Sequence, residues 1–576
     1  DHVWIPVGAT VAGQYRKETF DGTVERHEMA KSVQDCLAKL AELESRRYNW
    51  DNQWSEVAQL VWPQADDFKT DKHTPGEKRS LKIYDATAAL ALEKFAAAME
   101  SMLTPRAQKW HTLGSTNPDL NKDPAIKKWF ESVSRVMFQA RNSPKAGYYA
   151  QMHEGYKSLG AFGNTCLLVD EPKDGHGIRY VQCHVGSVYI ELDPARKVDT
   201  VYRKYMMSAK AAAQEWGRDK LPPKVAVAFE SVENHYKQFE FLHVVSPQIE
   251  QDRERKDYHG MPWMSYHISI EDKEIVDEGG YEEFPYMYGR YTVNPTEMYG
   301  RGPAMLVLPS IKMAQEMQKT FIRSGHKIVD PPLLLHDDGV LGTGSKQVRL
   351  TPGGLNYGGV DAQGRPLVVP LQTGARLDIT EGMLQKERET ILVTLFQILV
   401  DQPQMTATEA LIRAQEKGQL LAPTVGRQQS EILGPQIHRE FNILGRQGYL
   451  PEMPGVLAEA EGEYDITYES PAMRFQRSEE LVGIQRTLEI AMPFAQADPS
   501  ILSIFKPDEI IRLAAEINGA PSDILHTQEE MDEIAAQQAQ QAQQQQMMEA
   551  MQQIAPAAKD LAQAQQALPA EAGLEG

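Results

Sequence analysis

The chain has 576 residues, of which 41% are hydrophobic and 24% charged, a composition typical of a soluble globular protein with several domains. Its formal net charge is −20, which argues against a general nucleic-acid binder because such proteins are usually basic. The same charge is compatible with a protein that lets DNA pass without gripping it, since an acidic surface repels phosphates.

The cysteines and the apolar runs indicate the redox compartment of the protein and whether it enters a membrane. Three cysteines at unrelated spacing give neither a disulfide framework nor a metal-binding pattern, and they indicate a reducing compartment. The longest apolar run, ILVTLFQILV, has about ten residues and is too short to cross a bilayer. The N-terminus lacks the basic and then apolar pattern of a signal sequence. We therefore expect no membrane association, no cofactor and no metal.

The first part of the chain is predicted to be helical. Residues 1–28 have no regular pattern, and apolar residues at helical spacing then predict one or two helices that end at Pro63. We interpret the tryptophans of this stretch, Trp50 and Trp54, as core residues. Further helices are predicted over Ala91–Leu103, which Asp85 can cap, from Asp123 to about Arg141, and up to Gly160.

Alternating apolar and polar residues dominate from Asn164 to Tyr291, and this period of two predicts strands. One helix, Ala209–Trp216, is expected to interrupt them. The stretches with the clearest pattern are NTCLLVDE, GIRYVQCHV, SVYIEL, TVYRKYMM, FEFLHVV and WMSYHISI. The first half of the chain is therefore predicted to be α+β.

A long amphipathic helix is predicted after YGRGPAM (299–305), in which Pro303 suits a first helical turn. The consecutive prolines of DPPLLL (330–335) end it. Its apolar face holds Ile311, Ala314, Phe321, Ile322, Gly325 and Ile328. Its opposite, charged face holds Lys312, Glu316, Lys319, Arg323 and Lys327.

Signals for strands and turns fill 331–377, and helix returns after Asp378, which has Glu381 three residues on, the spacing of a capping box. DQPQ (401–404) breaks this helix. TATE (406–409) is a second capping box and opens a very long helix that keeps its period to about Leu444. Kinks in that helix are expected at Pro423 and at Gly434-Pro435.

The rest of the chain is predicted to contain one strand, several short helices and a low-complexity tail. YDITYES (464–470) predicts the strand, and the helices fall at about Arg477–Met492, Pro499–Phe505 and Pro507–Ile517. Residues 527–567 are rich in Gln and Ala, a composition that permits disorder but also favours helix. We expect a helix there that packs against neighbouring copies.

Catalytic motifs do not emerge from the sequence. GVLGTGSK (339–346) comes close to a phosphate-binding loop, but Ser345 and Lys346 are transposed, and a strand-like segment follows where that motif needs a helix. A turn is the better interpretation. The sequence contains no HExxH, no GxSxG and no Cys/His metal spacing. We therefore expect that the chain is not an enzyme.

The succession from Tyr299 to Gln447 resembles the portal proteins, or head-to-tail connectors, of short-tailed bacteriophages. The resemblance covers about Arg46 to Leu525 and implies an α+β, mainly α, portal fold assembled as a ring. The motifs that carry it are RRYNWDNQWSEVAQLVWPQ (46–64), YGRGPAM, DPPLLL followed by DDG, MTATEA (405–410), LAPTVGR (421–427) and SPAMRFQ (470–476). Each motif is short, and their shared order and spacing are what make the resemblance specific.

The resemblance also implies a division of the chain into regions. These are an N-terminal extension (1–28), a wing (29–298), a first stem helix (299–329), a clip (330–376), a second stem helix (377–400), a tunnel loop (401–405), a long wing helix with its return strand (406–470), a crown (471–526) and a C-terminal helical barrel (527–576).

Function and partners follow from the resemblance as expectations. Portal rings, dodecameric in the family, form the channel for double-stranded DNA at one capsid vertex during packaging, retention and ejection. The implied partners are further copies of the chain, the terminase large subunit, the major capsid protein and tail adaptor proteins, in a virion assembled in the host cytoplasm. The alternative is a non-portal scaffold or adaptor ring of the virion, which needs oligomerising helices but no clip.

The resemblance points to three groups of candidate site residues. The tunnel loop, expected to project into the channel unless it is an ordinary outer turn, consists of Asp401, Gln402, Pro403 and Gln404. The stem stripe, expected to face DNA in the channel, the capsid, a neighbouring subunit or solvent, consists of Lys312, Lys319, Arg323 and Lys327. The clip residues expected to dock terminase and tail proteins are Asp337, Asp338, Lys346 and Arg349.

Overall fold

The structure is a computed structural model. It describes residues 24–68, 76–80, 82–117, 119–173, 175–248, 257–335, 363–371, 377–396, 423–459, 464–468, 481–493 and 504–518, with single positions at 255 and 360 and a few between 531 and 544. Contacts divide the chain into two compact units. Unit 1 comprises Asp1–Thr116 and Phe130–Gln476, and unit 2 comprises Asn117–Trp129 and Arg477–Gly576.

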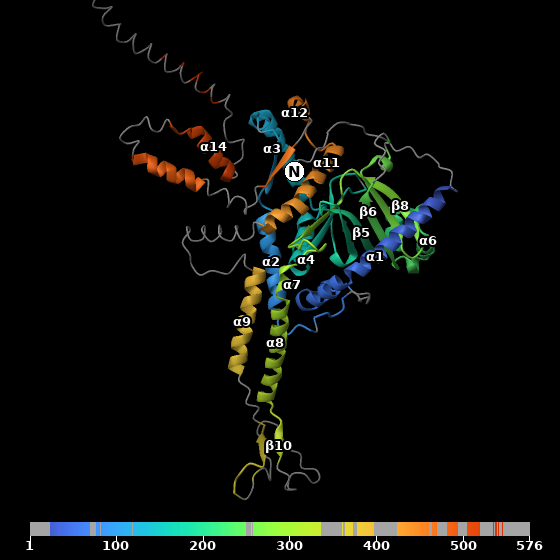
Figure 1. The fold of residues 1–576 in the computed structure, drawn as a ribbon, viewed down its shortest axis with the longest axis vertical. Helices are drawn as coiled ribbons and strands as arrows, with labels where there is room; N and C mark the ends of the chain where they lie inside the picture. The colour runs from blue at the N-terminus through green and yellow to red at the C-terminus, as the bar shows by residue number, and fades with distance from the viewer. Residues whose placement is uncertain are drawn as a thin grey trace, which may run out of the picture. The chain divides into compact units, whose positions relative to one another are not determined.

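A five-stranded antiparallel sheet forms one part of unit 1 (Figure 1), and each strand pairs with its neighbour in the sequence. Its strands are β4 (Val188–Leu192), β5 (Val198–Ser208), β6 (Gln238–Pro247), β7 (Trp263–Ser269) and β8 (Glu274–Tyr281). Two helices, α5 (Ala209–Trp216) and α6 (Pro223–Glu230), connect β5 to β6. Their buried alanines and Val225 pack against Phe239 and Phe241 of β6, so this connection closes its own small core.

A three-stranded sheet of order β3-β2-β9 lies at the centre of unit 1. Its strands are β2 (Asn164–Asp170), β3 (Arg179–Cys183) and β9 (Tyr286–Arg290). The central strand β2 is buried from Asn164 to Val169, since it has a neighbour on each side and helices against it. The helix α4 (Tyr148–Phe162) packs on β2 and leads directly into it, and α2 (Thr87–Leu103) packs on α4.

The long N-terminal helix α1 (Val24–Val61) supplies an aromatic part of the core. Trp54 is fully buried, its ring lies edge-on to Tyr299 at 5.3 Å, and its Nε1 donates a hydrogen bond to the Phe162 carbonyl oxygen. Trp50 is partly buried beside it. Their burial confirms the interpretation of these tryptophans as core residues. Burying the Trp54 indole this completely stabilises the fold and fixes α1 against α4.

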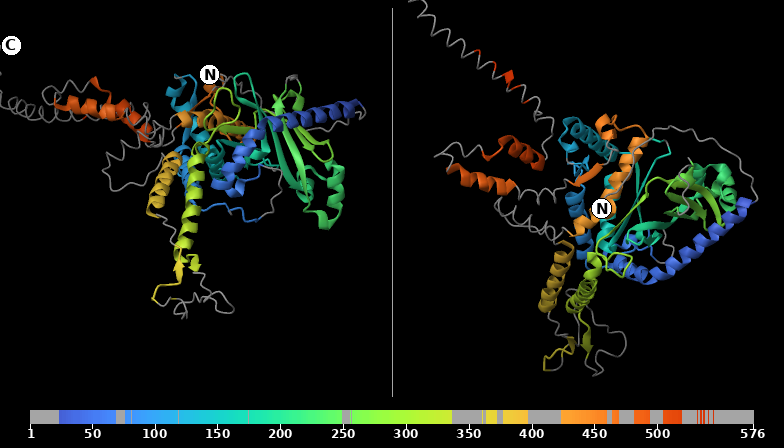
Figure 2. Two further views of the ribbon diagram at one scale, coloured as in Figure 1. Left: turned by 60° about the horizontal axis from the view of Figure 1, so that its bottom comes forward. Right: turned by 45° about the horizontal axis from the view of Figure 1, so that its top comes forward.

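A helical hairpin projects from the sheets of unit 1 (Figures 1 and 2). Its elements are α7 (Pro303–Leu306), α8 (Leu308–Val329), β10 (Leu333–Leu335), β11 (Val368–Pro370) and α9 (Leu377–Phe396). α8 and α9 pack side by side, and β10 pairs antiparallel with β11 at their far end. Leu384, Ile391 and Leu395 of α9 are buried in the same core as Ile311 and Ala314 of α8.

The last long helix of unit 1 is described from residue 423 onward and contains a wide turn. Residues 423–428 are α-helical, the turn η7 (Gln429–Leu433) is π-helical, and α11 (Gly434–Arg446) continues the helix. The distortion at Gly434-Pro435 was expected, because Pro435 has no N–H for the helical ladder. The turn packs tightly on β9, where a Cβ atom at Gly289 would overlap the Ile432 side chain.

The remaining elements of unit 1 include a second small sheet. β1 (His111–Ser115) pairs antiparallel with β12 (Tyr464–Tyr468), which stacks Tyr464 against Phe441 of α11 at 4.7 Å. The predicted return strand is therefore present. The helix α12 (Gly455–Glu459) precedes it, and α3 (Pro124–Asn142) has its first residues in unit 2 and the rest in unit 1. Short 3-10 turns occur at Pro63–Ala65, Val185–Ser187, Arg218–Lys220, Val232–Asn234 and Tyr258–Gly260.

Unit 2, by itself, is described mainly by two helices. These span residues 481–493 and α14 (Pro507–Asn518), and a 3-10 turn lies at Leu120–Lys122. Ile484, Phe505 and Ile510 line an open hollow of about 520 Å³ between the two helices. Both helices fall where the sequence predicted them.

Three details of the sequence predictions are wrong. The first helix begins at Val24, inside the stretch predicted to be irregular up to residue 28. A second helix, α6, follows α5 where one was expected, because Pro222-Pro223 starts a new helix rather than a turn. α9 begins at Leu377, so Asp378 lies in its first turn instead of capping it. The first and third errors concern helix boundaries, where local signals are weakest, and the second is a short helix that was not predicted.

We predict that Gly163→Ala destabilises unit 1 far more than the matched change Gly147→Ala. Both glycines have positive φ, 72° and 65°, so both substitutions carry a backbone cost of about 1–2 kcal/mol. A Cβ atom at Gly147 meets nothing, whereas one at Gly163 would overlap the backbone of Arg301 and Gly302. We expect an additional loss of about 1–3 kcal/mol at Gly163, measured by urea unfolding of the two variants. Equal losses would contradict the packing.

Candidate functional site

The charged stripe predicted on the first hairpin helix lies on α8, opposite the residues that pack toward the core. Lys312 forms an ion pair with Glu56 of α1. Lys319 forms one with Glu316 in its own helix at 3.0 Å, and its ammonium lies 5.7 Å from the centre of the Tyr84 ring. These two lysines are therefore occupied by groups of their own chain.

Arg323 and Lys327 behave differently from the other two members of the stripe. Both side chains are exposed, and within the described part of the chain neither has a hydrogen-bond or ion-pair partner. They lie one helical turn apart, toward the β10–β11 end of the hairpin. Two adjacent cations without a partner can bind phosphate or the carboxylates of another chain.

The other predicted site residues lie outside the described residues. This holds for the tunnel-loop residues Asp401, Gln402, Pro403 and Gln404. It also holds for the clip residues Asp337, Asp338, Lys346 and Arg349. The strands β10 and β11 are described parts of the predicted clip, and they pair in the register Leu333↔Pro370 to Leu335↔Val368.

A buried carboxylate holds the base of the hairpin. Asp85, just before α2, accepts a hydrogen bond from Arg388 Nε of α9 at 2.7 Å and one from the Thr87 N–H at 2.8 Å. Gln315 of α8 accepts from the backbone N–H of Asp85 and donates to its carbonyl. Burial alone would raise the pKa of Asp85, but the bonds from Thr87 and Arg388 outweigh it and place that pKa below its usual value. Asp85 thus fixes both hairpin helices to α2.

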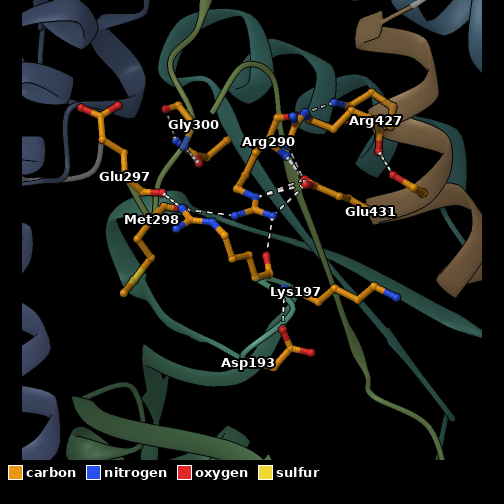
Figure 3. A network of polar contacts seen from close by, with 12 residues as sticks. Asp193, Lys197, Arg290, Glu297, Met298, Gly300, Arg427 and Glu431 are labelled. Carbon is orange, nitrogen blue, oxygen red and sulfur yellow. Dashed lines mark hydrogen bonds and ion pairs between the residues drawn. The ribbon is translucent and has the colours of Figure 1, made fainter. Parts of the chain in front are cut away.

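A second polar cluster joins the π-helical turn to the sheet (Figure 3). Glu431 accepts hydrogen bonds from Arg290 of β9, both from its backbone N–H at 2.8 Å and from its guanidinium, also at 2.8 Å. Arg427, one turn earlier, reaches the same carboxylate at 3.2 Å. Gln428 donates to the Arg290 carbonyl at 2.8 Å. Gln428, just before the widened turn, and Glu431, within it, therefore both bond to Arg290 of one strand.

The guanidinium of Arg290 also bonds to the segment that enters the hairpin. It donates to the Met298 carbonyl at 3.4 Å and to the Arg196 carbonyl at 3.1 Å (Figure 3). Arg196 in turn donates to the Glu297 carbonyl at 2.6 Å. One arginine thus connects the long helix, a strand, a surface turn and the start of the hairpin, so the directions of the two long helical segments depend on each other.

A third cluster is fully buried and contains an ion pair. Arg141 of α3 and Glu440 of α11 have almost no exposed surface, and Arg141 Nε donates to Glu440 Oε2 at 2.7 Å. Tyr180 donates to the other carboxylate oxygen at 2.7 Å. His111 accepts from Arg141 at 2.6 Å, and burial together with that neighbouring cation lowers its pKa well below the usual range. These contacts join α3, β1, β3 and α11 in the interior.

Two stacked histidines lie inside the five-stranded sheet. His243 of β6 and His267 of β7 are cross-strand partners with ring centres 4.1 Å apart. His243 bonds to the hydroxyls of Tyr286 and Ser265, and His267 to that of Tyr205. Burial lowers both pKa values, that of His267 to about 4. Both rings are therefore neutral at pH 7.

Sequence reasoning missed these clusters, although one signal was present. Arg439 and Glu440 fall among the apolar residues Ile437, Phe441 and Leu444 of a predicted amphipathic helix, where a charge implies a buried partner. The partner cannot be read from the sequence, since Arg141 is 299 residues away from Glu440. The described residues contain no group of three or more side chains suited to a metal ion. None of the described helices combines the length and apolarity of a membrane span.

Comparison with known proteins gives a consistent result. The sequence model of the family "bacteriophage head to tail connecting protein" matches residues 33–525. The chain is 28% identical over 548 residues to the portal protein of Salmonella phage epsilon15, an alignment that covers 93% of this chain and 97% of the relative. It is 26% identical over 502 residues to a probable portal protein of Bordetella phage BPP-1, covering 85% and 88%.

We predict that Glu440→Gln costs about 3–5 kcal/mol of unfolding free energy, because it leaves the Arg141 charge buried without a counterion. The double variant Arg141→Met with Glu440→Gln removes that charge and keeps an acceptor for Tyr180. We expect it to be more stable than Glu440→Gln alone. Denaturant unfolding of both variants measures the difference, and simple additivity of two losses would contradict the buried pair.

We predict that acid destabilises unit 1 through His267. Its folded pKa of about 4 lies below the unfolded value near 6.5, so the unfolded chain binds the proton first. Stability is therefore complete above pH 6.5 and is lost as pH falls toward 4, by about 3 kcal/mol in total. Unfolding titrations between pH 6.5 and 5 should show this slope, and His267→Gln should reduce it, while His243 and His111, whose pKa values are also lowered, keep the remainder. An unchanged slope in the variant would refute the assignment.

Proposed function

This chain belongs to the family of bacteriophage head-to-tail connecting proteins, and we propose that its copies assemble into a ring that conducts double-stranded DNA at one vertex of the capsid. The observation that carries this conclusion is the family match, which spans most of the chain and both units. The chain has the portal function, as a component of the phage virion. The proposal assigns it no catalytic step.

The proposed channel is lined in part by the hairpin and by the segment after it. The α8–α9 hairpin supplies the stem, with β10 and β11 as part of the clip. The tunnel loop, Asp401 to Gln404, lies between α9 and the long helix in sequence, and we propose that it projects into the channel. The net charge of −20 per chain supports passage without tight binding, because an acidic ring repels phosphates.

The proposed partners bind at the clip end and the outside of the ring. Asp337, Asp338, Lys346 and Arg349 of the clip are proposed to dock the terminase large subunit and later the tail adaptor proteins. The wing is proposed to contact the major capsid protein, in virions assembled in the host cytoplasm. A dodecamer is the proposed stoichiometry.

Exposed apolar side chains on the hairpin support association of copies. Val393 and Met383 of α9 are each about half exposed, and Val329 at the end of α8 is 86% exposed. In the described part of one chain these groups stay exposed, whereas a neighbouring hairpin in a ring would remove them from water. A heterologous contact repeated by rotation closes into a ring.

We predict that electron microscopy of the purified chain shows rings with a central hole of roughly 20 Å, the width of duplex DNA. The double variant Met383→Gln with Val393→Gln should weaken assembly, since it makes the exposed α9 face polar. Val232→Gln serves as the matched control, because Val232 is also exposed but lies on a connection of the five-stranded sheet. Folded monomers at micromolar concentration, or filaments and solid shells, would overturn the proposal.

A further inference from the structure

The two hairpin helices carry stripes of opposite charge. Besides its apolar residues, α9 has acidic groups at helical spacing on one flank, with no basic side chain among them. This flank consists of the acidic residues Asp378, Glu381 and Glu389, with the neutral Gln385 between the last two. The stripe of α8 has four basic residues and one acidic one. A basic and an acidic stripe on neighbouring helices suggest an electrostatic contact.

Among the residues that the structure describes, that contact is not made inside one chain. Lys312 and Lys319 pair with Glu56 and Glu316, and none of the ion pairs of the described residues joins the basic stripe of α8 to α9. Glu381 is exposed and, among the described residues, has no hydrogen-bond or ion-pair partner. Arg323 and Lys327 are likewise exposed and, among the described residues, have no hydrogen-bond or ion-pair partner. Three exposed charges of complementary sign thus remain available on one hairpin.

Arg323, Lys327 and Glu381 lie at matching positions along the axis of the hairpin. Arg388 of α9 bonds to Gln318 of α8 at 3.4 Å, which fixes the relative level of the two antiparallel helices. Both helices rise by about 1.5 Å per residue. Counting from that contact, Glu381 lies at the level of Gly325, between Arg323 and Lys327. A rotation about a ring axis parallel to the hairpin preserves this level, so neighbouring copies present the same match.

We propose that, in the ring of the proposed function, Arg323 and Lys327 of one copy form ion pairs with Glu381 of the next copy. The pairing is heterologous: the basic stripe of each α8 meets the acidic flank of the neighbouring α9. This assignment rests on ring assembly and specifies which faces of the stem meet.

A second copy fits this site better than DNA does. A phosphate backbone bound to Arg323 and Lys327 would leave the Glu381 carboxylate, which lies at the same level of the hairpin, without a partner. That carboxylate would also be close to the negative charge of the phosphates. A second copy pairs Arg323, Lys327 and Glu381 at once.

Charge reversal and mixing test the proposal in the full-length chain. Two charge-reversal variants are compared, Glu381→Lys and the double variant Arg323→Glu with Lys327→Glu. Each places like charges at every interface, so ring formation should require at least about tenfold more protein. Mixing the two variants should restore rings, because alternating copies then present opposite charges at each contact. A charge pair within one subunit cannot be restored by mixing. Sedimentation and electron microscopy measure ring formation.

The controls separate this proposal from the function on which it rests. Glu233→Lys makes the same charge change at an exposed position of the wing and should assemble like the unmodified chain. Normal rings from both reversed variants would overturn the proposal, as would failure of the mixture. Normal rings that bind or retain DNA less well would place the basic pair in the channel and also overturn it. If the unmodified chain forms no rings, the proposed function itself fails.

Discussion

Unit 1 depends on a place where two backbones approach so closely that side chains are excluded. Gly163 ends α4, and Gly300 and Gly302 lie in the segment that enters α7. The Asn164 side chain donates to the Gly300 carbonyl at 2.9 Å and accepts from the Gly300 N–H at 2.7 Å, so the contact is also hydrogen bonded in both directions. Because this contact joins the central sheet to the hairpin, the direction of the hairpin depends on the core around that sheet.

Buried charges extend this connection to the last long helix. Glu431 binds Arg290 at the edge of the sheet, and Glu440 binds Arg141 in the interior. Buried ion pairs add little net stability over apolar contacts, but each one strongly disfavours arrangements that separate its partners. The helix from residue 423 to Arg446 is thereby held in one register against β9. The segment that enters the hairpin and this helix share Arg290 as a common support, which couples the hairpin to the central sheet.

The charge of α8 differs in sign from that of the whole chain. The whole sequence is acidic, yet α8 carries an excess of basic residues, two of which are satisfied locally and two of which are exposed. The acidic flank of α9 lies on the same hairpin. A ring built from such hairpins can therefore combine attraction between copies with overall repulsion of DNA, since the two effects act over different distances in salt.

The sequence by itself determined most of the local structure. The helices Ala209–Trp216 and 308–329, the strands from β2 to β7 and the burial of Trp54 follow from periodicity, proline positions and residue size, which act over a few neighbouring residues. The family also followed from the order of short motifs.

Only the tertiary structure decided which distant groups meet. The pairing of β1 with β12, the partners of Arg141 and Arg290, the opposition of Cys166 and Cys183 on adjacent strands, and the level of Glu381 relative to Arg323 depend on contacts between segments far apart in the chain. No local pattern encodes such contacts, because a buried charge or an exposed strand edge requires a partner without specifying where in the sequence that partner lies.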